Sequence, residues 1–408
     1  MITELLKTVK VAYKKTLTSI AFLPAVIALF LLVLSIVMVQ FDFSTAGKAI
    51  KSNLHWLSLK DADTARSICA AITSGVISLT VFSFSMVMIL LNQAASQMTN
   101  RILDKVIGNR FQQTILGFYI GTIVYALFLL STIRDINSGI YVPAISTYLL
   151  IGLTIADIFL FIYFLHYVTQ MVKYETIIHS VYDDTRKAIK KSCLLKDSPP
   201  AEVAEVKGTA INSSKAGLYQ GFDRNALLSL CEREDLVVSF FYPVGSYLLE
   251  NSPLVVVEHT KPLNEDVCRS LEVVINIHTG REINTSYYYG FIQLMEIAVR
   301  ALSPGINDPG TAIMSLQALG DLLAMRINHF PETTITDKNG KVRIITKERS
   351  FEEVFAETIL PVWDYGKKDR LLQQEMLHIL QQLRAKERYP VIEKMLHTVQ
   401  METGKFNI

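Results

Sequence analysis

An acidic residue near the middle of a long apolar stretch has the most specific chemistry in the chain. Asp157 follows 13 residues after the start of segment 144–168, which contains no other acid and no lysine or arginine. A charge at the centre of a bilayer costs roughly 2.5–3.5 kcal/mol, so such residues usually carry a function. Thr154, one turn earlier, is expected to share its helix face and to donate a hydrogen bond to it. Three interpretations remain: a structural contact between helices, a role in cation or proton passage, and an inert protonated acid.

A stripe of small and polar residues runs along segment 71–99. Spacings of three and four residues alternate along it, which keeps the side chains on one face of a helix. Two large apolar residues interrupt the stripe, and the other faces are mostly apolar. We expect the stripe to turn away from lipid, either as a seam that admits another helix or as the wall of a wet path. The stripe comprises Gly75, Ser78, Phe82, Ser85, Ile89, Asn92 and Ser96.

The segment 300–309, RALSPGINDP, is the third candidate for a site. Its prolines and glycine predict a tight connection between two helices. Asp308 followed by Pro309 is typical of a helix start, with a capping side chain before proline at the first helical position. Two interpretations remain open here. Turn and capping chemistry explains the segment alone, or a small ligand or ion binds Arg300, Asn307, Asp308 and the amides of the helix start.

Signatures of the common enzyme classes are absent from the sequence. It contains no phosphate-binding GxxxxGK[ST] or GxGxxG, no HExxH, no GxSxG and no calcium-binding EF-hand loop. None of the four cysteines has a metal-ligand spacing, and we interpret them as reduced packing residues. We therefore predict no catalytic residue, no metal and no cofactor.

Four apolar stretches are each long enough to cross about 30 Å of hydrocarbon as a helix. The third of them contains Gly117 and Gly121, a GxxxG pattern that lets two helices approach closely. The four spans are predicted at 19–40, 68–91, 115–133 and 144–168.

The segments that flank the spans complete the membrane part. Residues 1–18 are expected to form an amphipathic helix, and 41–67 a loop that ends in a cap formed by Asp61, Asp63 or Thr64. We expect the second span to continue as a polar helix to about Gln112. The fourth span is predicted to continue out of the membrane to about Lys191.

The remainder of the chain reads as a soluble sequence after the linker SPP at 198–200. Residues 201–260 alternate short apolar runs with turn residues, which predicts a small β-rich domain with one helix. Residues 261–408 are predicted to be mainly helical. Local signals there include a helix from Asn264 to Gly280, a hairpin at 334–345, and a capping box of Ser350 with Glu353.

The predicted fold class is therefore a membrane α-helical protein with four transmembrane helices and a C-terminal α+β cytoplasmic region. Its predicted domains are 1–191, 201–260 and 261–408. Half of the 408 residues are hydrophobic and mean hydropathy is +0.31, which agrees with a membrane part of this size. The net charge of +2 gives no general attraction to nucleic acid, so no nucleic-acid partner is expected.

The distribution of lysine and arginine predicts the orientation of the chain. These residues are more frequent in segments 1–18, 92–114 and 169–191 than in segments 41–67 and 134–143. Positive charge favours the cytoplasmic side. We therefore predict a multi-pass protein of the bacterial cytoplasmic membrane with both termini in the cytoplasm.

Three strings together resemble a known bacterial family. They are SFSMVMILLNQAASQMTNRIL at 83–103, QTILGFYIGTIVY at 113–125 and IAVRALSPGINDPGTA at 297–312. The chain is similar, over nearly its whole length, to predicted membrane proteins grouped as domain of unknown function 2254. The resemblance implies four spans plus a cytoplasmic domain. It implies no activity.

Three functions are compatible with these features. The favoured hypothesis is a homo-oligomeric ion channel or pore lined by the second spans, with a cytoplasmic regulatory domain and an ion or small ligand as its partner. The alternative is a membrane-anchored sensor or scaffold, in which the spans serve as anchor and dimer seam. An enzyme acting on lipid is the least favoured, because no acid, base and nucleophile cluster near the interface.

Overall fold

A computed structural model of the protein describes residues 21–53, 61–97, 110–136, 139–171, 173–196, 206–259, 262–278, 283 and 286–404. Its contacts divide the chain into two compact units, Met1–Lys173 and Tyr174–Ile408. We call them the N-terminal unit and the C-terminal unit and describe each by itself. The amphipathic helix predicted at 1–18 lies outside the described residues.

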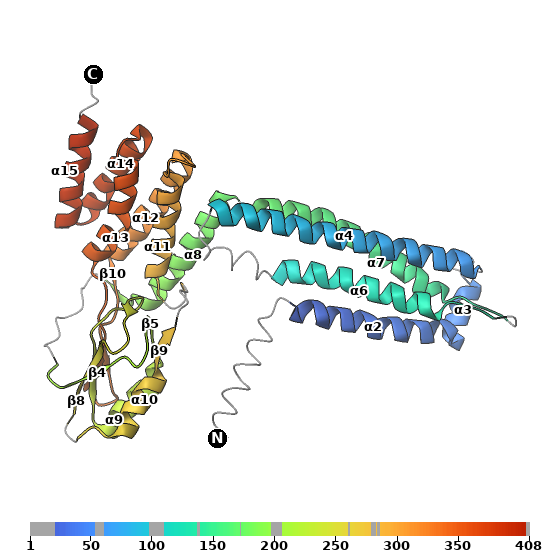
Figure 1. Ribbon diagram of the computed structural model, residues 1–408, viewed down its shortest axis with the longest axis horizontal. Helices are drawn as coiled ribbons and strands as arrows, with labels where there is room; N and C mark the ends of the chain where they lie inside the picture. The colour runs from blue at the N-terminus through green and yellow to red at the C-terminus, as the bar shows by residue number, and fades with distance from the viewer. Residues whose placement is uncertain are drawn as a thin grey trace. The chain divides into compact units, whose positions relative to one another are not determined.

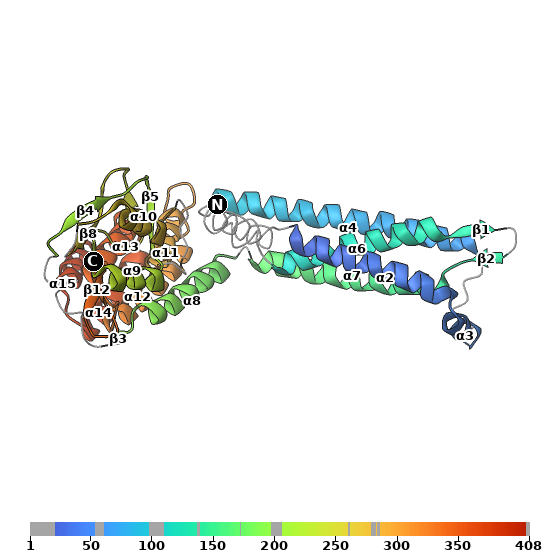
Figure 2. The ribbon, with the colours of Figure 1, turned by 90° about the horizontal axis from the view of Figure 1, so that it is seen from below.

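Four helices of membrane length form most of the N-terminal unit, which confirms the four predicted apolar spans. The helices run alongside one another in Figure 2. Lipid offers no hydrogen bonds, and an α-helix satisfies its backbone groups internally, so charge-free runs of this length fold as helices. Their bounds are α2 (Phe22–Phe43), α4 (Ala62–Gln97), α6 (Arg110–Thr132) and α7 (Ala144–Met171).

The prediction of a loop at 41–67 was wrong at both ends, where the structure has helix, since α4 already begins at Ala62. The helix α2 continues to Phe43, and the short helix α3 (Thr45–Asn53) follows it. Ser44 is the overlooked signal, because its hydroxyl accepts a hydrogen bond from the amide of Gly47 at 3.1 Å and caps α3.

Of the three residues predicted as possible caps of the second span, Asp61 is the one that caps α4. Its carboxylate accepts hydrogen bonds from the amides of Asp63 (3.2 Å) and Thr64 (2.9 Å). At the other end of this helix, residues 98–109 lie outside the described part. Gln112 belongs to α6 and not to the helix of the second span.

The helix α6 is the centre of the N-terminal unit. In an 18-residue apolar stretch of α6, 44% of the residues are buried, against 17% in the corresponding stretch of each of the other three spans. Gly117 and Gly121 explain how α2 comes so close. A Cβ atom on Gly117 would lie 2.7 Å from the side chain of Ile27, and one on Gly121 would lie 2.4 Å from Leu31. The GxxxG pattern therefore joins α6 to α2. The hairpin β1 (Arg134–Ile136) and β2 (Gly139–Tyr141) follows α6.

The C-terminal unit begins with α8 (Tyr174–Ser192), which is a separate helix and not a continuation of α7. Lys173 lies outside both helices. The helix α8 packs on α11 (Tyr288–Ala301) and α12 (Pro309–Ile327). A Cβ atom on Gly290 would lie 1.7 Å from the Thr185 hydroxyl, so glycine at 290 is needed for this contact. The packing thus groups α8 with the C-terminal unit.

The strands of the C-terminal unit come from both sides of residue 260. The largest sheet has the order β11-β12-β6-β8-β4, in which only β12 and β6 run parallel. A second sheet has the antiparallel order β7-β5-β9, and β10 pairs with β3. The strands are β3 (Leu195–Lys196), β4 (Thr209–Asn212), β5 (Gly217–Phe222), β6 (Val237–Phe240), β7 (Tyr247–Leu248), β8 (Pro253–Glu258), β9 (Ile275–His278), β10 (His329–Phe330), β11 (Thr334–Thr336) and β12 (Val342–Ile345).

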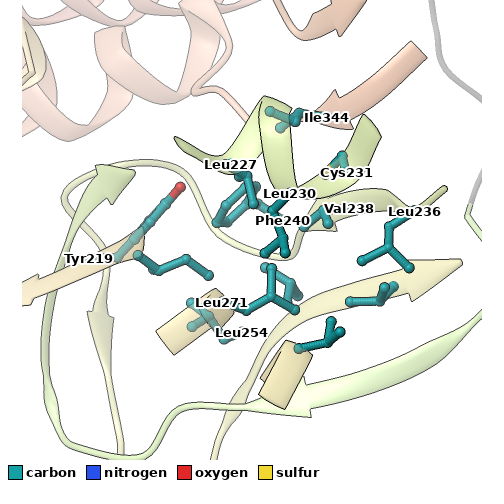
Figure 3. Close-up of a cluster of buried hydrophobic side chains, with 14 of the residues drawn as sticks. Tyr219, Leu227, Leu230, Cys231, Leu236, Val238, Phe240, Leu254, Leu271 and Ile344 are labelled. Atoms are coloured by element: carbon teal, nitrogen blue, oxygen red, sulfur yellow. The ribbon is translucent and has the colours of Figure 1, made fainter. Parts of the chain in front are cut away.

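One apolar cluster joins these sheets to α9 (Arg224–Glu234) and α10 (Glu265–Val274). Figure 3 shows Leu227 and Leu230 of α9 facing Phe240 of the largest sheet, with Leu271 of α10 close by. The helix predicted to end at Gly280 was wrong at that end, because α10 stops at Val274. Residues 275–278 alternate between buried and exposed, and this two-residue period favours the strand β9.

Three further helices complete the C-terminal unit, and Figure 1 shows α11, α12, α14 and α15 in one group. Capping side chains predicted from the sequence begin three of the helices of this unit. Asn264 caps α10, Asp308 caps α12, and Ser350 forms a capping box with Glu353. The hairpin at 334–345 is also confirmed, with Gly340 at φ 79°. The last three helices are α13 (Phe351–Gly366), α14 (Arg370–Lys386) and α15 (Pro390–Gly404).

Candidate functional site

The polar stripe lies on a face of α4 that the other described helices leave largely uncovered. Wherever the structure describes a stripe side chain, that side chain is exposed. Phe82 is 53% exposed and Ile89 is 65% exposed. Nothing lies within 4 Å of where a Cβ atom on Gly75 would be. The exposed members are Gly75, Ser78, Phe82, Ser85, Ile89 and Asn92, while Ser96 lies in α4 among residues whose side chains are not described.

The opposite face of α4 packs against α6 and α7. Its buried residues repeat with the same spacing as the stripe, displaced by about half a turn. They include Ala65, Cys69, Val76 and Ser83. The four-helix arrangement therefore uses the other face of α4 and leaves the stripe available for lipid, water or another chain.

Two stripe residues have contacts within the chain. The ring of Phe82 meets the ring of Phe161 on α7 edge to face, with centroids 5.8 Å apart. The hydroxyl of Ser78 donates to the carbonyl of Ser74 at 2.9 Å, so its hydrogen-bonding capacity is met inside the helix. Neither contact covers the stripe, but the first fixes Phe82 beside α7.

Asp157 is buried inside the N-terminal unit, with 1% of its surface exposed. The expected hydrogen bond from Thr154 is absent, because that hydroxyl donates to the carbonyl of Leu150 on its own helix at 2.8 Å. The neighbour of Asp157 is instead Thr122 of α6. A threonine inside a helix readily bonds the carbonyl four residues earlier, which explains the difference.

Asp42 is a buried acid that the sequence analysis did not identify. Its carboxylate accepts hydrogen bonds from the amides of Ile145 (3.1 Å) and Ser146 (2.8 Å), and from the Ser146 hydroxyl (2.5 Å). Lys51 lies 3.2 Å from the same carboxylate. Asp42 thus caps the start of α7 from the end of α2. The available signal was an acid directly after a long charge-free run, followed much later by a helix start without a local cap.

The loop between α11 and α12 has the geometry of a helix cap. Asp308 accepts hydrogen bonds from the amide (3.1 Å) and hydroxyl (2.6 Å) of Thr311. Asn307 has φ 49°, in the left-handed region that asparagine tolerates. Burial raises the pKa of Tyr174, the first residue of α8, and Asp308 raises it further while Arg300 opposes it. Arg300 and Asp308 therefore both lie near the start of α8.

A buried charged cluster in the C-terminal unit was also missed. Arg326 is 2% exposed and donates to the carbonyls of His329 (2.6 Å) and Arg349 (3.2 Å) and to the Tyr287 hydroxyl (3.4 Å). Burial raises the pKa of Glu348 to about 7, and Arg326 and Arg349 oppose this shift. The cluster joins the end of α12 to the segment before α13. Its members are separated in sequence and carry no local motif.

No three histidine, cysteine, aspartate or glutamate side chains gather into a metal-binding group in the described part of the chain. Its four cysteines are free thiols, and Cys69, Cys193 and Cys231 are buried. These observations leave two arrangements with functional potential in the N-terminal unit, namely the exposed stripe and the buried acid.

Comparison with known proteins agrees with this architecture. The profile of a family described as "Predicted membrane protein (DUF2254)" matches residues 18–382. Uncharacterized proteins of Mycobacterium bovis and Mycobacterium tuberculosis are 23% identical to the chain in an alignment of 331 positions that covers 78% of this chain. The chain spans 63% of the length of these relatives. No solved structure matches the chain.

Proposed function

We propose that this chain, which belongs to the DUF2254 family of predicted membrane proteins, is a homo-oligomeric ion channel or pore. In this proposal copies of α4 line the path, and the C-terminal unit is the regulatory part. The membrane is the bacterial cytoplasmic membrane, and both termini lie in the cytoplasm, as the lysine and arginine distribution favours.

The observation that carries the proposal is the outward direction of the stripe. A face rich in glycine and serine gains little from contact with lipid tails, since small side chains offer few packing contacts. The same face suits close approach of another helix, or water in a central path. The described residues of the chain do not cover this face at Gly75, where a Cβ atom would meet nothing within 4 Å. A ring of at least three chains places the stripes around a common axis.

The second candidate is a membrane-anchored sensor or scaffold without transport. Two contacts favour it. The ring of Phe82 is held by Phe161, and the hydroxyl of Ser78 is satisfied by its own helix, so neither requires water beside it. In this case two copies of α4 meet along the stripe as a dimer seam.

The number of chains in the assembly separates the two candidates. Native mass spectrometry of the full-length protein is expected to show three or more copies. A leucine at Gly75 is expected to break this assembly, because its side chain enters the face that the copies share. Gly152 on α7 is the matched control, since it is also exposed with open space at its Cβ position. A stable dimer would support the scaffold, and a monomer would contradict both candidates.

A further inference from the structure

Four buried oxygen atoms in the described part of the N-terminal unit form no hydrogen bond of normal length. They belong to three helices, with one on α4, two on α6 and one on α7. The residues are all at most 5% exposed. Burying such a group without a partner is costly, so most buried polar atoms in proteins are satisfied. The atoms are Ser83 Oγ, Tyr119 Oη, Thr122 Oγ1 and Asp157 Oδ2.

These side chains form one cluster and not four isolated cases. Thr122 interacts with the carboxyl group of Asp157. Tyr119, about one turn from Thr122 on the same face of α6, interacts with both Ser83 and Asp157. The contact between the rings of Phe82 and Phe161 places α4 beside α7 at the same level. Pairwise interactions therefore link one carboxyl group and three hydroxyl groups of the three helices into one connected cluster.

The cluster lacks a positive charge of its own. In the described helices α2, α4, α6 and α7, the cationic residues are Arg66 and Arg110 near helix starts. Arg110 is 12 residues from Thr122, which corresponds to about 18 Å along α6. An ionised Asp157 at this depth therefore finds no counter-charge among the described helices of the N-terminal unit.

We propose that Asp157, Thr122, Tyr119 and Ser83 bind one sodium ion inside each chain. Carboxylate and hydroxyl oxygens are hard ligands that suit alkali and alkaline-earth cations and do not favour zinc or copper. A single carboxylate balances one positive charge, whereas divalent calcium usually takes several acidic ligands. The bound ion satisfies the four oxygen atoms together and neutralises the acid.

The site is independent of the proposed pore. Ser83 lies on the packed face of α4, on the opposite side from the stripe. Sodium binding is therefore expected whether copies of α4 form a channel, a dimer seam or neither. Measuring binding and not conduction keeps the two proposals apart.

The test uses full-length protein in lipid nanodiscs and compares sodium chloride with choline chloride at equal ionic strength. Sodium is expected to raise the melting temperature of the wild type in proportion to the logarithm of its concentration, because it binds the folded state. Equilibrium binding of radioactive sodium is expected to saturate at one ion per chain. Asp157→Asn is expected to abolish both responses, since the amide carries no charge.

Two milder variants keep the test decisive if Asp157→Asn does not fold. Thr122→Val and Ser83→Ala each remove one oxygen ligand and are expected to weaken sodium binding at least about tenfold. Thr154→Val is the matched control, because its hydroxyl bonds Leu150 and not the cluster, and it is expected to bind as the wild type does. Equal melting of the wild type in both salts, with no saturable sodium binding, would overturn the proposal. Unchanged binding by Thr122→Val and Ser83→Ala would overturn it as well.

Discussion

Replacing Phe82 by serine is expected to raise the single-channel conductance of the reconstituted protein. In a ring of α4 helices, Phe82 and Ile89 form two apolar constrictions seven residues apart, about 10.5 Å along the axis. A narrow apolar ring can exclude water and block ions without a physical plug. A serine ring holds water, and lowering the barrier by about 1.4 kcal/mol raises the ion flux roughly tenfold. Planar-bilayer recording of Phe82→Ser and Ile89→Ser measures this effect.

Phe84→Ser is the matched control for the aromatic substitution. Phe84 is on the same helix and is 60% exposed, similar to Phe82, but it is not part of the stripe. Its replacement is expected to leave conductance unchanged. Phe82→Ser also loses the contact with Phe161, so the assembly must be shown intact before recording. If the assembly is intact but neither the wild type nor the Phe82 and Ile89 variants conduct ions, the pore hypothesis is wrong and the scaffold hypothesis remains.

Glu348→Gln is expected to remove a pH dependence from the stability of the C-terminal unit. The pKa of Glu348 is raised from 4.5 to about 7 in the folded protein, chiefly by burial. The unfolded chain therefore loses this proton at a lower pH than the folded chain does. The contribution of Glu348 to stability is greatest below about pH 4.5, falls as pH rises to about 7, and is constant above that. The loss amounts to about 3 kcal/mol.

Urea unfolding followed by the fluorescence of Trp363, which is 4% exposed in α13, measures this change. Trp56→Phe removes the other tryptophan from the signal. The wild type is expected to lose stability between pH 5 and 7 more steeply than Glu348→Gln. Glu232→Gln, at an exposed position on α9, is the control and should follow the wild type. Parallel curves for the wild type and Glu348→Gln would show that Glu348 titrates normally in the folded state.

Local signals in the sequence predicted much of this fold. A run of apolar residues without charge has one stable form in a bilayer, so the four spans followed from composition. Asp61, Asn264, Asp308 and Ser350 each cap a helix through amides two or three residues away. Such bonds depend only on neighbouring residues, and these caps were visible for that reason. Ser44, which caps α3 by the same chemistry, was overlooked although its signal was local.

The failures involve partners that are distant in the sequence. Residues 275–278 were predicted as the end of a helix, but in the structure they pair with β5, which lies more than fifty residues earlier in the chain. A hydrogen bond between Asp157 and Thr154 was predicted because both residues lie on one helix, whereas the observed neighbour of Asp157 is Thr122 on α6. Asp42 caps a helix that begins about a hundred residues later. A helical period shows which side chains share a face, but not which neighbour that face meets.

The stripe illustrates the same distinction in the candidate site. Its period showed that these residues share one side of α4. The exposed fractions of Phe82 and Ile89 now show that α6 and α7 leave that side largely uncovered, apart from the contact of Phe82 with Phe161 on α7. A single chain contains no information on what covers it. A stripe that lines a water-filled path and a stripe buried in a seam between helices differ in whether water reaches the middle of α4. This difference can be measured.

The accessibility of Ser78→Cys to a charged, membrane-impermeant thiol reagent tests the channel most directly. The experiment uses the assembled protein with its four native cysteines replaced by alanine. Ile77→Cys is the matched control, because Ile77 is 44% exposed on α4 but points away from the stripe. The channel predicts that the reagent modifies the cysteine at position 78 and blocks the current, while position 77 stays unmodified in lipid. Protection of both positions would contradict a water-filled path along the stripe.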